Sequence, residues 1–105
     1  MKTEHDIQNE IRLALSHNGF CVFRINSGKV KMEDGRWFDT NIPVGFSDLF
    51  AVKNGKAYFI EVKRVDGHAS INQLNFLDTM HNRYGCRSGI ARSVEDAYKI
   101  CEVIK

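Results

Sequence analysis

The sequence of 105 residues has no apolar run long enough to cross a membrane, and its N-terminus lacks the apolar region of a signal peptide. We therefore expect an intracellular protein without membrane spans. A strong charge of one sign is also absent, because fifteen basic and thirteen acidic residues leave a formal net charge of +2. This balance permits binding to nucleic acid but does not by itself indicate it. No repeat, linker or low-complexity segment divides the chain, so we expect a single domain over residues 1–105.

Cysteine is scarce, and its spacing excludes a zinc site of the usual kind. Cys21, Cys86 and Cys101 are odd in number, far apart, and show no paired spacing of metal ligands. Each lies in an apolar strand or helix pattern, so we expect three small buried hydrophobic residues. This use of cysteine is typical of a reducing compartment.

The stretch Tyr58–Lys63 predicts a strand, because it is rich in aromatic and β-branched residues. Side chains alternate along a strand, so one row stays apolar as far as Val62. The other row begins with Phe59 and ends in Glu61 and Lys63. Taken alone, a Glu-x-Lys pattern is typical of an exposed strand end with an ordinary ion pair.

A second acid, Asp48, changes this interpretation. It opens the predicted strand Leu49–Val52, and the turn signal Asn54–Gly55 joins that strand to the next as a hairpin. Pairing residue 53 with 56 sets Asp48 opposite Glu61. Two carboxylates at one place repel each other unless a cation lies between them. Oxygen ligands favour a hard ion such as Mg²⁺, bound together with water and a substrate phosphate. Lys63 would then hold the attacking water and offset the charge that develops on the phosphate.

The first predicted helix, Glu4–Asn18, is capped by Thr3 and ended by Gly19. Glu10 falls inside its apolar arc. One interpretation is a third acid that reaches the metal through a bound water. The other is a flanking glutamate whose stem packs on the core while its carboxylate reaches solvent.

A second helix is predicted from the cap Ser70 to about Tyr84. Gln73 lies on its apolar stripe, where it would donate to the scissile phosphate or orient the attacking water. Ser70-x-x-Gln73 also fits a capping box, which is a purely structural role. A strand, Cys86–Ala91, follows, and Ser93 opens a last helix.

Between the first helix and Asp48, the segment Phe20–Asn26 shows little alternation, so we expect a strand buried on both faces. Lys29–Phe38 then predicts a β-ribbon that turns at Asp34–Gly35. Basic residues interleaved with Trp37 and Phe38 would follow a phosphate backbone and stack on a base. Alternatively, the aromatic face of the ribbon covers the core.

The predicted order is helix, three strands with an inserted ribbon, helix, strand and helix, which indicates an α/β fold with a mixed sheet flanked by helices. With its acids and lysine in this order, the chain resembles the restriction-endonuclease-like PD-(D/E)XK nucleases, and among them the VRR-NUC (virus-type replication-repair nuclease) domain. Pro43 stands five residues before Asp48 instead of beside it, a departure from the superfamily pattern. The matching segments are Gln8 and Glu10, Arg24–Gly28, Gly45–Asp48, Phe59–Lys63 and Ser70–Gln73.

This resemblance implies a deoxyribonuclease that hydrolyses phosphodiester bonds with Mg²⁺ or Mn²⁺. Asp48, Glu61 and the Val62 carbonyl would bind the metal directly, and Glu10 would bind it through water. Lys63 would serve the nucleophile and Gln73 would support the site. The implied DNA contacts are Arg24, Asn26, Ser27, Lys29, Lys31, Arg36, Ser47 and Arg64.

Small members of this family are similar to Holliday-junction resolvases, which implies a structure-selective endonuclease that cuts branched DNA as a homodimer. If the chain is phage-encoded, the compartment would be the cytoplasm of a bacterial host. The candidate interfaces are the ribbon around Met32, Trp37 and Phe38, and the last helix around Tyr98 and Ile104. Three alternatives stay open: a nuclease of simple duplex ends or single strands, a nucleic-acid-binding module without chemistry, and a protein-interaction domain without metal dependence.

Overall fold

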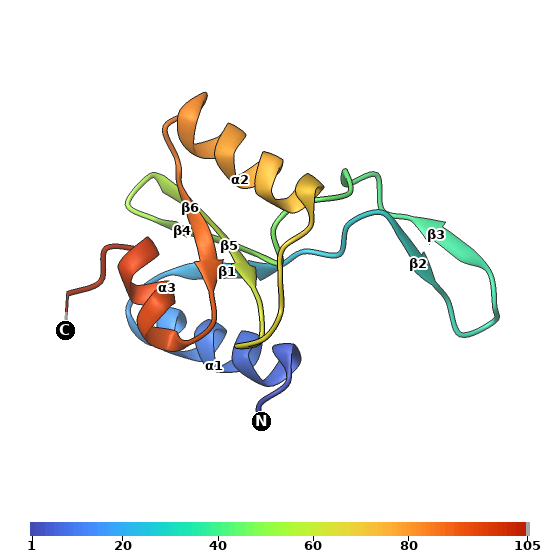
Figure 1. The fold of residues 1–105 in the computed structure, drawn as a ribbon, viewed down its shortest axis with the longest axis horizontal. Coiled ribbons are helices and arrows are strands. Elements are labelled where there is room, and N and C mark those ends of the chain that lie inside the picture. Colours follow the sequence, from blue (N-terminus) through green and yellow to red (C-terminus); the bar gives the residue numbers. More distant parts are fainter. Residues whose placement is uncertain (105) are drawn as a thin grey trace.

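The computed structural model describes residues 1–104, which form three helices and six strands (Figure 1). Their order is the predicted one. None of the described helices is long and apolar enough to pass through a membrane. The elements are α1 (Glu4–His17), β1 (Cys21–Arg24), β2 (Lys29–Lys31), β3 (Trp37–Asp39), β4 (Leu49–Lys53), β5 (Lys56–Val62), α2 (Ile71–Asn82), β6 (Arg87–Ala91) and α3 (Val94–Ile100).

Four strands form one mixed sheet in the order β1-β4-β5-β6. The pairs β1–β4 and β4–β5 are antiparallel, whereas β5–β6 is parallel because α2 provides the crossover. Helices α1 and α3 cover one face of the sheet and α2 covers the other (Figure 1). The predicted mixed sheet flanked by helices is confirmed.

The main core lies between the sheet and the helices α1 and α3. Alternation along β5 sends Ile60 and Val62 to this face, where both are fully buried. Helix α1 contributes Ile11 and Leu15 from its apolar stripe, and both side chains are also inaccessible to solvent. The predicted cap of α1 is confirmed, because Thr3 forms a capping box with the first turn.

A second apolar layer lies beneath α2 and consists mainly of phenylalanine. The rings of Phe50 and Phe59 stack with centroids 5.1 Å apart, and Phe76 of α2 meets Phe59 at 5.4 Å. Phe46, from the loop before β4, lies 4.4 Å from Phe76. The row of β5 that begins at Phe59 is therefore buried as well, and Glu61 is its next member.

The hairpin of β4 and β5 has the predicted register, with Lys53 opposite Lys56 and Leu49 opposite Ile60. Its turn is made by Asn54 and Gly55, whose φ angles of 52° and 76° match the left-handed turn that this dipeptide favours. One further step along the register places residue 48 opposite residue 61.

The expectation that the first strand is buried on both faces is wrong. β1 is an edge strand that pairs only with β4; α1 packs on one of its faces, whereas α2, on the other side of the sheet, packs on β5 and β6. Phe23 stacks on Phe50 yet stays 48% exposed. Cys21 is exposed for the same reason, which corrects its predicted burial.

The other two cysteines differ in their exposure to solvent. Cys86 precedes β6 and is only half-buried, so its predicted burial is also incorrect in part. Cys101 is buried as expected, and this burial raises the pKa of its thiol to about 12. Helices α2 and α3 are shorter than the sequence predicts. Tyr84 and Ile104, which were expected on their apolar sides, lie beyond the helix ends and are exposed.

The ribbon of β2 and β3 forms a separate two-stranded sheet that projects from the body of the molecule (Figure 1). Every residue of both strands is exposed. The alternative in which the aromatic face of the ribbon covers the core is therefore excluded.

Gly45 fixes the path of the chain into Asp48, and its replacement tests the packing of this loop. Its φ is +97°, and a Cβ there would stand 2.7 Å from the Asn72 carbonyl oxygen of α2. Gly35, with φ of +88°, has open space at the same point. Left-handed strain alone costs about 1–2 kcal/mol, which we expect for Gly35→Ala. Gly45→Ala should cost clearly more in the free energy of unfolding by urea, because backbone atoms must also move. Equal losses would contradict tight packing of this loop.

Candidate active site

Asp48 and Glu61 meet where the central strand β4 begins and β5 ends, as the hairpin register predicts. Glu61 is the second-last residue of β5, and its side chain is only 1% exposed. Asp48 Oδ2 accepts a hydrogen bond of 2.9 Å from the backbone N–H of Val62. The Asp48 carbonyl accepts another, of 2.8 Å, from the N–H of Ile25. Asp48 is therefore held between the end of β5 and the segment that leaves β1.

Lys63 lies on the same side of the strand as Glu61, as predicted from alternation. Its Nζ is 3.3 Å from Glu61 Oε2, and its side chain is 13% exposed. The Lys63 N–H donates to the Ala91 carbonyl, which continues the pairing with β6 beyond the strand. The lysine and the two acids thus converge on one patch, supported by three neighbouring strands.

The electrostatics of Glu61 are unfavourable for an ionised carboxylate. Burial, and then the closeness of Asp48, raise the pKa of Glu61 to about 8, although Lys63 acts in the opposite direction. Neither oxygen of Glu61 has a hydrogen bond of ordinary geometry. Within residues 1–104, only one other buried side-chain oxygen or nitrogen shares this condition, and it is Gln8 Oε1. Buried polar atoms normally have hydrogen-bond partners, so the two unpartnered oxygens of Glu61 are the clearest sign of a binding site.

The donor set fits a hard divalent cation. Buried carboxylate oxygens that accept no hydrogen bond, beside a second carboxylate, are ligands that Mg²⁺ and Mn²⁺ prefer. The Val62 N–H donates to Asp48. Since the N–H and C=O of one residue in an extended strand point to the same side, the Val62 carbonyl also points towards Asp48. In the described part of the chain, no three His, Cys, Asp or Glu side chains converge on one point. Further ligands would therefore be main-chain, water or substrate oxygens.

Glu10 does not join the acid pair, which corrects the expectation of a third acid. Its Oε1 lies 2.6 Å from Lys2 Nζ, and its side chain is 40% exposed. It borders a hollow near α3 together with Arg92 and Glu95. The physical reason is the direction in which position 10 points from α1. The interpretation of a flanking glutamate whose carboxylate reaches solvent is the one that the structure supports.

Gln8 is the α1 residue that sequence reasoning did not assign to the site. It lies roughly 200° around the helix from Glu10, and it is 9% exposed. Glu4, one turn earlier on the same side, reaches the loop after Lys63, because its Oε2 would stand 3.3 Å from a Cβ at Gly67. Gln8 follows one turn later, and its Oε1 is buried without a hydrogen-bond partner. The available signal was an amide inside the apolar stripe of the helix.

Gln73 has the structural role that was the alternative for it. Its Oε1 accepts a hydrogen bond of 2.8 Å from the Ser70 N–H, and Ser70 Oγ accepts one of 3.2 Å from the Gln73 N–H. No hydrogen bond among the described residues joins Gln73 to the acid pair. Its amide oxygen caps α2.

The predicted DNA contacts have different positions in the structure. Ser47 is buried, with 1% exposure, and its Oγ donates to the Leu49 carbonyl, so the prediction of a DNA contact there is wrong. Arg64 is exposed and lies 3.4 Å from Asp66. Ser27 is half-buried. The remaining predicted contacts are exposed: Arg24, Asn26, Lys29, Lys31 and Arg36.

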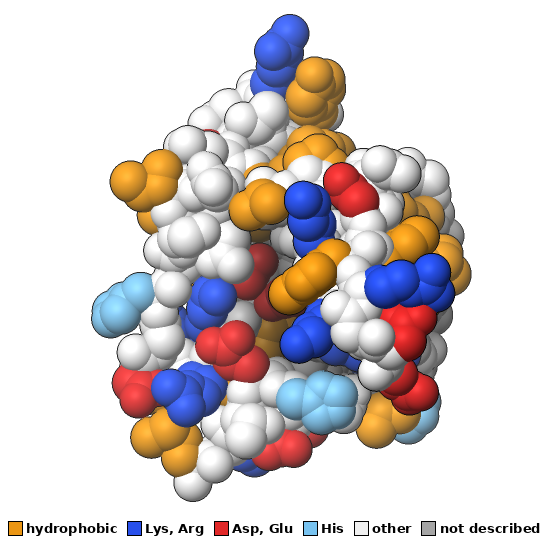
Figure 2. All heavy atoms as spheres, turned by 90° about the vertical axis from the view of Figure 1, so that its right-hand side faces the viewer, with side chains coloured by type: hydrophobic (Ala, Val, Ile, Leu, Met, Phe, Trp, Pro, Cys, Tyr) orange, Lys and Arg blue, Asp and Glu red, His pale blue; other side chains and the backbone are white. Residues whose placement is uncertain are grey.

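Figure 2 views the molecule from the side on which the ribbon projects. Acidic atoms lie recessed in a hollow of this face, and Lys and Arg side chains stand around them. Such an arrangement admits an anionic ligand more readily than an even acidic surface would.

The raised pKa of Glu61 predicts a pH-dependent stability of the metal-free protein. Its folded value of about 8 exceeds the ordinary value of 4.5, so folding favours the protonated form. The resulting stability is complete below pH 4.5 and is lost as the pH rises to about 8. Glu61→Gln removes this titration. Relative to wild type, the variant should gain on the order of a few kcal/mol across this window, measured by urea unfolding with a chelator present. A constant difference between the two proteins would contradict the raised pKa of the buried Glu61 carboxyl.

Comparisons with known proteins agree on the fold. No family model matches the chain, and no curated protein matches it either. A solved structure of a VRR_NUC domain superposes with a TM-score of 0.68 at 20% sequence identity, and the match covers 99% of this chain and 100% of that one. The Holliday junction resolvase Hjc of Archaeoglobus fulgidus gives a TM-score of 0.54 at 19% identity, covering 81% of this chain and 64% of the resolvase.

At these identities the superpositions show the fold alone. The first of them spans nearly the whole of both chains, so the mixed sheet, its three covering helices and their order are shared. The predicted resemblance is therefore confirmed at the level of architecture: this chain has the fold of a VRR_NUC domain and, over most of its length, of a Holliday junction resolvase.

Proposed function

We propose that this protein is a metal-dependent DNA endonuclease that hydrolyses phosphodiester bonds in branched DNA. The observation that carries the proposal is the buried Glu61, whose two oxygens lack hydrogen bonds, beside Asp48 and Lys63. Support comes from the fold shared with a VRR_NUC domain and with a protein described as a Holliday junction resolvase.

In the proposed mechanism, Asp48, Glu61 and the Val62 carbonyl hold Mg²⁺ or Mn²⁺. When bound, such an ion polarises a phosphoryl oxygen and makes water acidic enough to attack at neutral pH. Glu61 must release its proton first, so ion binding should strengthen as the pH rises towards 8. Lys63 Nζ, close to Glu61, holds the attacking water and offsets the negative charge that develops on the phosphate.

A binding module without chemistry is the second candidate, and the acid pair argues against it. Partly buried carboxylates repel a phosphate and destabilise the folded chain unless a cation binds. A protein that only binds DNA would gain nothing from them. Cleavage of duplex ends or of single strands in preference to junctions would keep the enzyme class and change its substrate.

We further propose that the working species is a homodimer with two-fold symmetry. Two symmetric cuts in a four-way junction need two active sites related by such an axis. Met32 and Phe38 of the ribbon are 45% and 57% exposed, so they remain available to a second copy. Ile104, beyond α3, is also exposed. Sedimentation of the free protein and of its junction complex should show a dimer. A strict monomer that binds one-to-one would leave a nuclease but not a resolvase.

Substitutions at the acid pair and at the lysine test the chemistry. With Mg²⁺ and a four-way junction, Asp48→Ala should abolish cleavage while leaving the fold intact, because one metal carboxylate is lost. Lys63→Ala should lower kcat by at least about a hundredfold, the scale of one lost electrostatic group, with little change in DNA affinity. Flap, duplex and single-strand substrates, each with and without Mg²⁺, measure selectivity and metal dependence together. Near wild-type cleavage by Asp48→Ala would refute this site.

We also propose that Gln8, whose buried Oε1 has no hydrogen-bond partner, belongs to the site, and a matched pair of variants on α1 tests it against Glu10. Gln8→Ala removes a buried amide whose Oε1 has no hydrogen-bond partner, so kcat on the same junction should fall by roughly tenfold or more, a scale typical of one positioned group. Glu10→Ala removes an exposed carboxylate paired with Lys2, and activity should stay near wild type. The opposite ranking would restore Glu10 to the site. Thermal unfolding of both variants checks that neither effect arises from lost folding.

A further inference from the structure

The ribbon begins and ends beside the acid pair. The chain leaves β1 through Ile25, whose N–H donates to the Asp48 carbonyl, and it returns through Gly45 to Asp48. The base of the ribbon is closed by hydrogen bonds from the Gly28 N–H to the Ile42 carbonyl and from the Thr40 N–H to the Gly28 carbonyl, both 2.9 Å. We call the ribbon, residues 29–39, the arm. A ligand bound at Asp48 and Glu61 would therefore lie close to the root of the arm.

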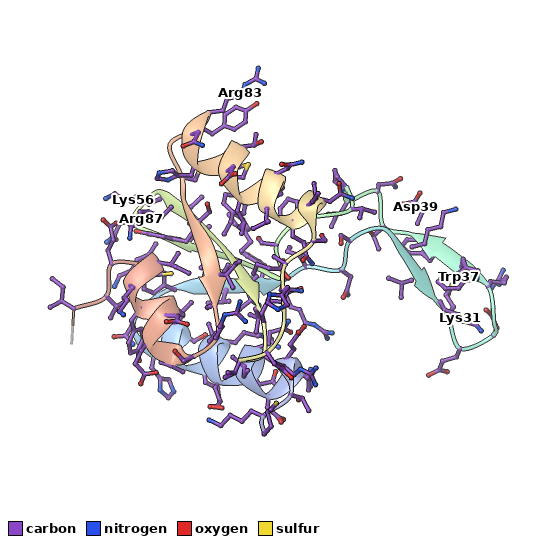
Figure 3. The ribbon with its side chains drawn as sticks, viewed as in Figure 1. Lys31, Trp37, Asp39, Lys56, Arg83 and Arg87 are labelled. Atoms are coloured by element: carbon purple, nitrogen blue, oxygen red, sulfur yellow. The ribbon has the colours of Figure 1, made fainter. Side chains whose placement is uncertain are left out.

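From that root the arm extends away from the body (Figures 1 and 3). Residues 29–39 are all exposed, and the two strands pair only with each other. Six residues separate its root from its tip, a reach of roughly 20 Å at about 3.3 Å per residue. This reach is comparable with half a turn of duplex DNA, about 17 Å. An isolated two-stranded ribbon is only marginally stable, so we expect its exposed side chains to bind a partner.

The two faces of the arm differ in character. Strand alternation and the pairing of Lys31 with Trp37 place Lys29, Lys31 and Trp37 on one face, together with Asp39. Figure 3 shows Lys31 and Trp37 on the outer part of the arm and Asp39 nearer its root. The other face carries Val30, Met32, Arg36 and Phe38.

Charge also separates the two faces. The Arg36 guanidinium lies 2.7 Å from Asp34, so its charge is locally neutralised. Lys29 and Lys31 have no ion pair with any described residue, and Asp39 accepts a hydrogen bond from the Asn41 N–H. Trp37 is 64% exposed and touches no other described aromatic ring. Unpaired ammonium groups beside a bare indole are the chemistry that binds phosphates and a base together.

We propose that the face formed by Lys29, Lys31 and Trp37 binds an unpaired DNA segment next to the scissile phosphate. Trp37 stacks on an exposed base, and the two lysines contact the flanking phosphates. Bases inside a duplex are covered by their neighbours, so this contact selects branch points, flaps and single strands. The inference rests on the proposed function and names its substrate class: DNA with unpaired bases beside the cut.

Trp37 reports directly on this contact, because it is the single tryptophan of the chain. Wild-type protein in a chelator, which prevents metal-dependent cleavage, is titrated with a short single strand, a four-way junction carrying an unpaired base, and a blunt duplex of the same sequence. Stacking should quench the indole emission with the first two ligands and much less with the duplex. No quenching by any ligand, or equal quenching by the duplex, would overturn the proposal.

A matched variant separates the two faces of the arm. Exchanging the aromatics, as Trp37→Phe with Phe38→Trp, moves the only indole to the opposite face and keeps the composition. Its emission should respond little to single-stranded DNA, and an equal response would remove the assignment of the face. Trp37→Ala should weaken single-strand binding about tenfold, and Lys31→Ala should reduce the salt dependence by about one counterion. Emission of wild type that changes with protein concentration alone, and not with DNA, would assign this face to a second copy instead.

Cleavage, measured separately with Mg²⁺, distinguishes this inference from the proposed function. Cleavage that Asp48→Ala abolishes, without quenching of Trp37 by any DNA, would refute the arm and keep the nuclease. Quenching without metal-dependent cleavage would refute the nuclease, and with it the claim that the bound strand is a substrate. Quenching and cleavage of the same unpaired substrates would support both.

Discussion

The burial of Glu61 beside Asp48 is the constraint on which the rest of this structure depends. Moving an ionised carboxylate out of water costs several kcal/mol, and a second carboxylate nearby adds repulsion. Lys63, 3.3 Å away, offsets only part of this cost, since the pKa of Glu61 still rises to about 8. In the absence of metal, protonation relieves the strain. A divalent cation would relieve it with the acid ionised, which is the physical basis of the proposed metal dependence.

The fold holds this unfavourable pair rigidly. Strand β5 lies between β4 and β6, with Ile60 packed against one helical layer and Phe59 against the other, so Glu61 cannot turn towards solvent. Asp48 is fixed from both sides by backbone hydrogen bonds, and Gly45 presses the preceding loop against α2. The ribbon is the opposite case, because nothing in the described monomer covers it. The proposed centre for chemistry is thus buried and the proposed arm for recognition is exposed, and Asp48 ends the loop that returns from the arm.

Much of this architecture follows from local signals. The Asn54–Gly55 turn sets the hairpin register, and that register alone predicts the meeting of Asp48 with Glu61. Exposure was less predictable. The apolar run of β1 indicated a strand covered on both faces, yet its place at the sheet edge leaves Phe23 half open to solvent. Position in the sheet depends on all the other strands, so a single run of residues does not encode it.

The sequence by itself determined the order of the elements, the helix caps and the acid pair, because each depends on residues close along the chain or joined by one tight turn. The tertiary structure alone decided which polar side chains of α1 and its neighbours are buried and what each of them contacts. Gln8 is buried with its Oε1 unpartnered, Glu10 pairs with Lys2, and the Ser47 hydroxyl donates to the Leu49 carbonyl. These outcomes depend on how a helix is rotated against the sheet and how a loop closes, which packing across the whole domain sets.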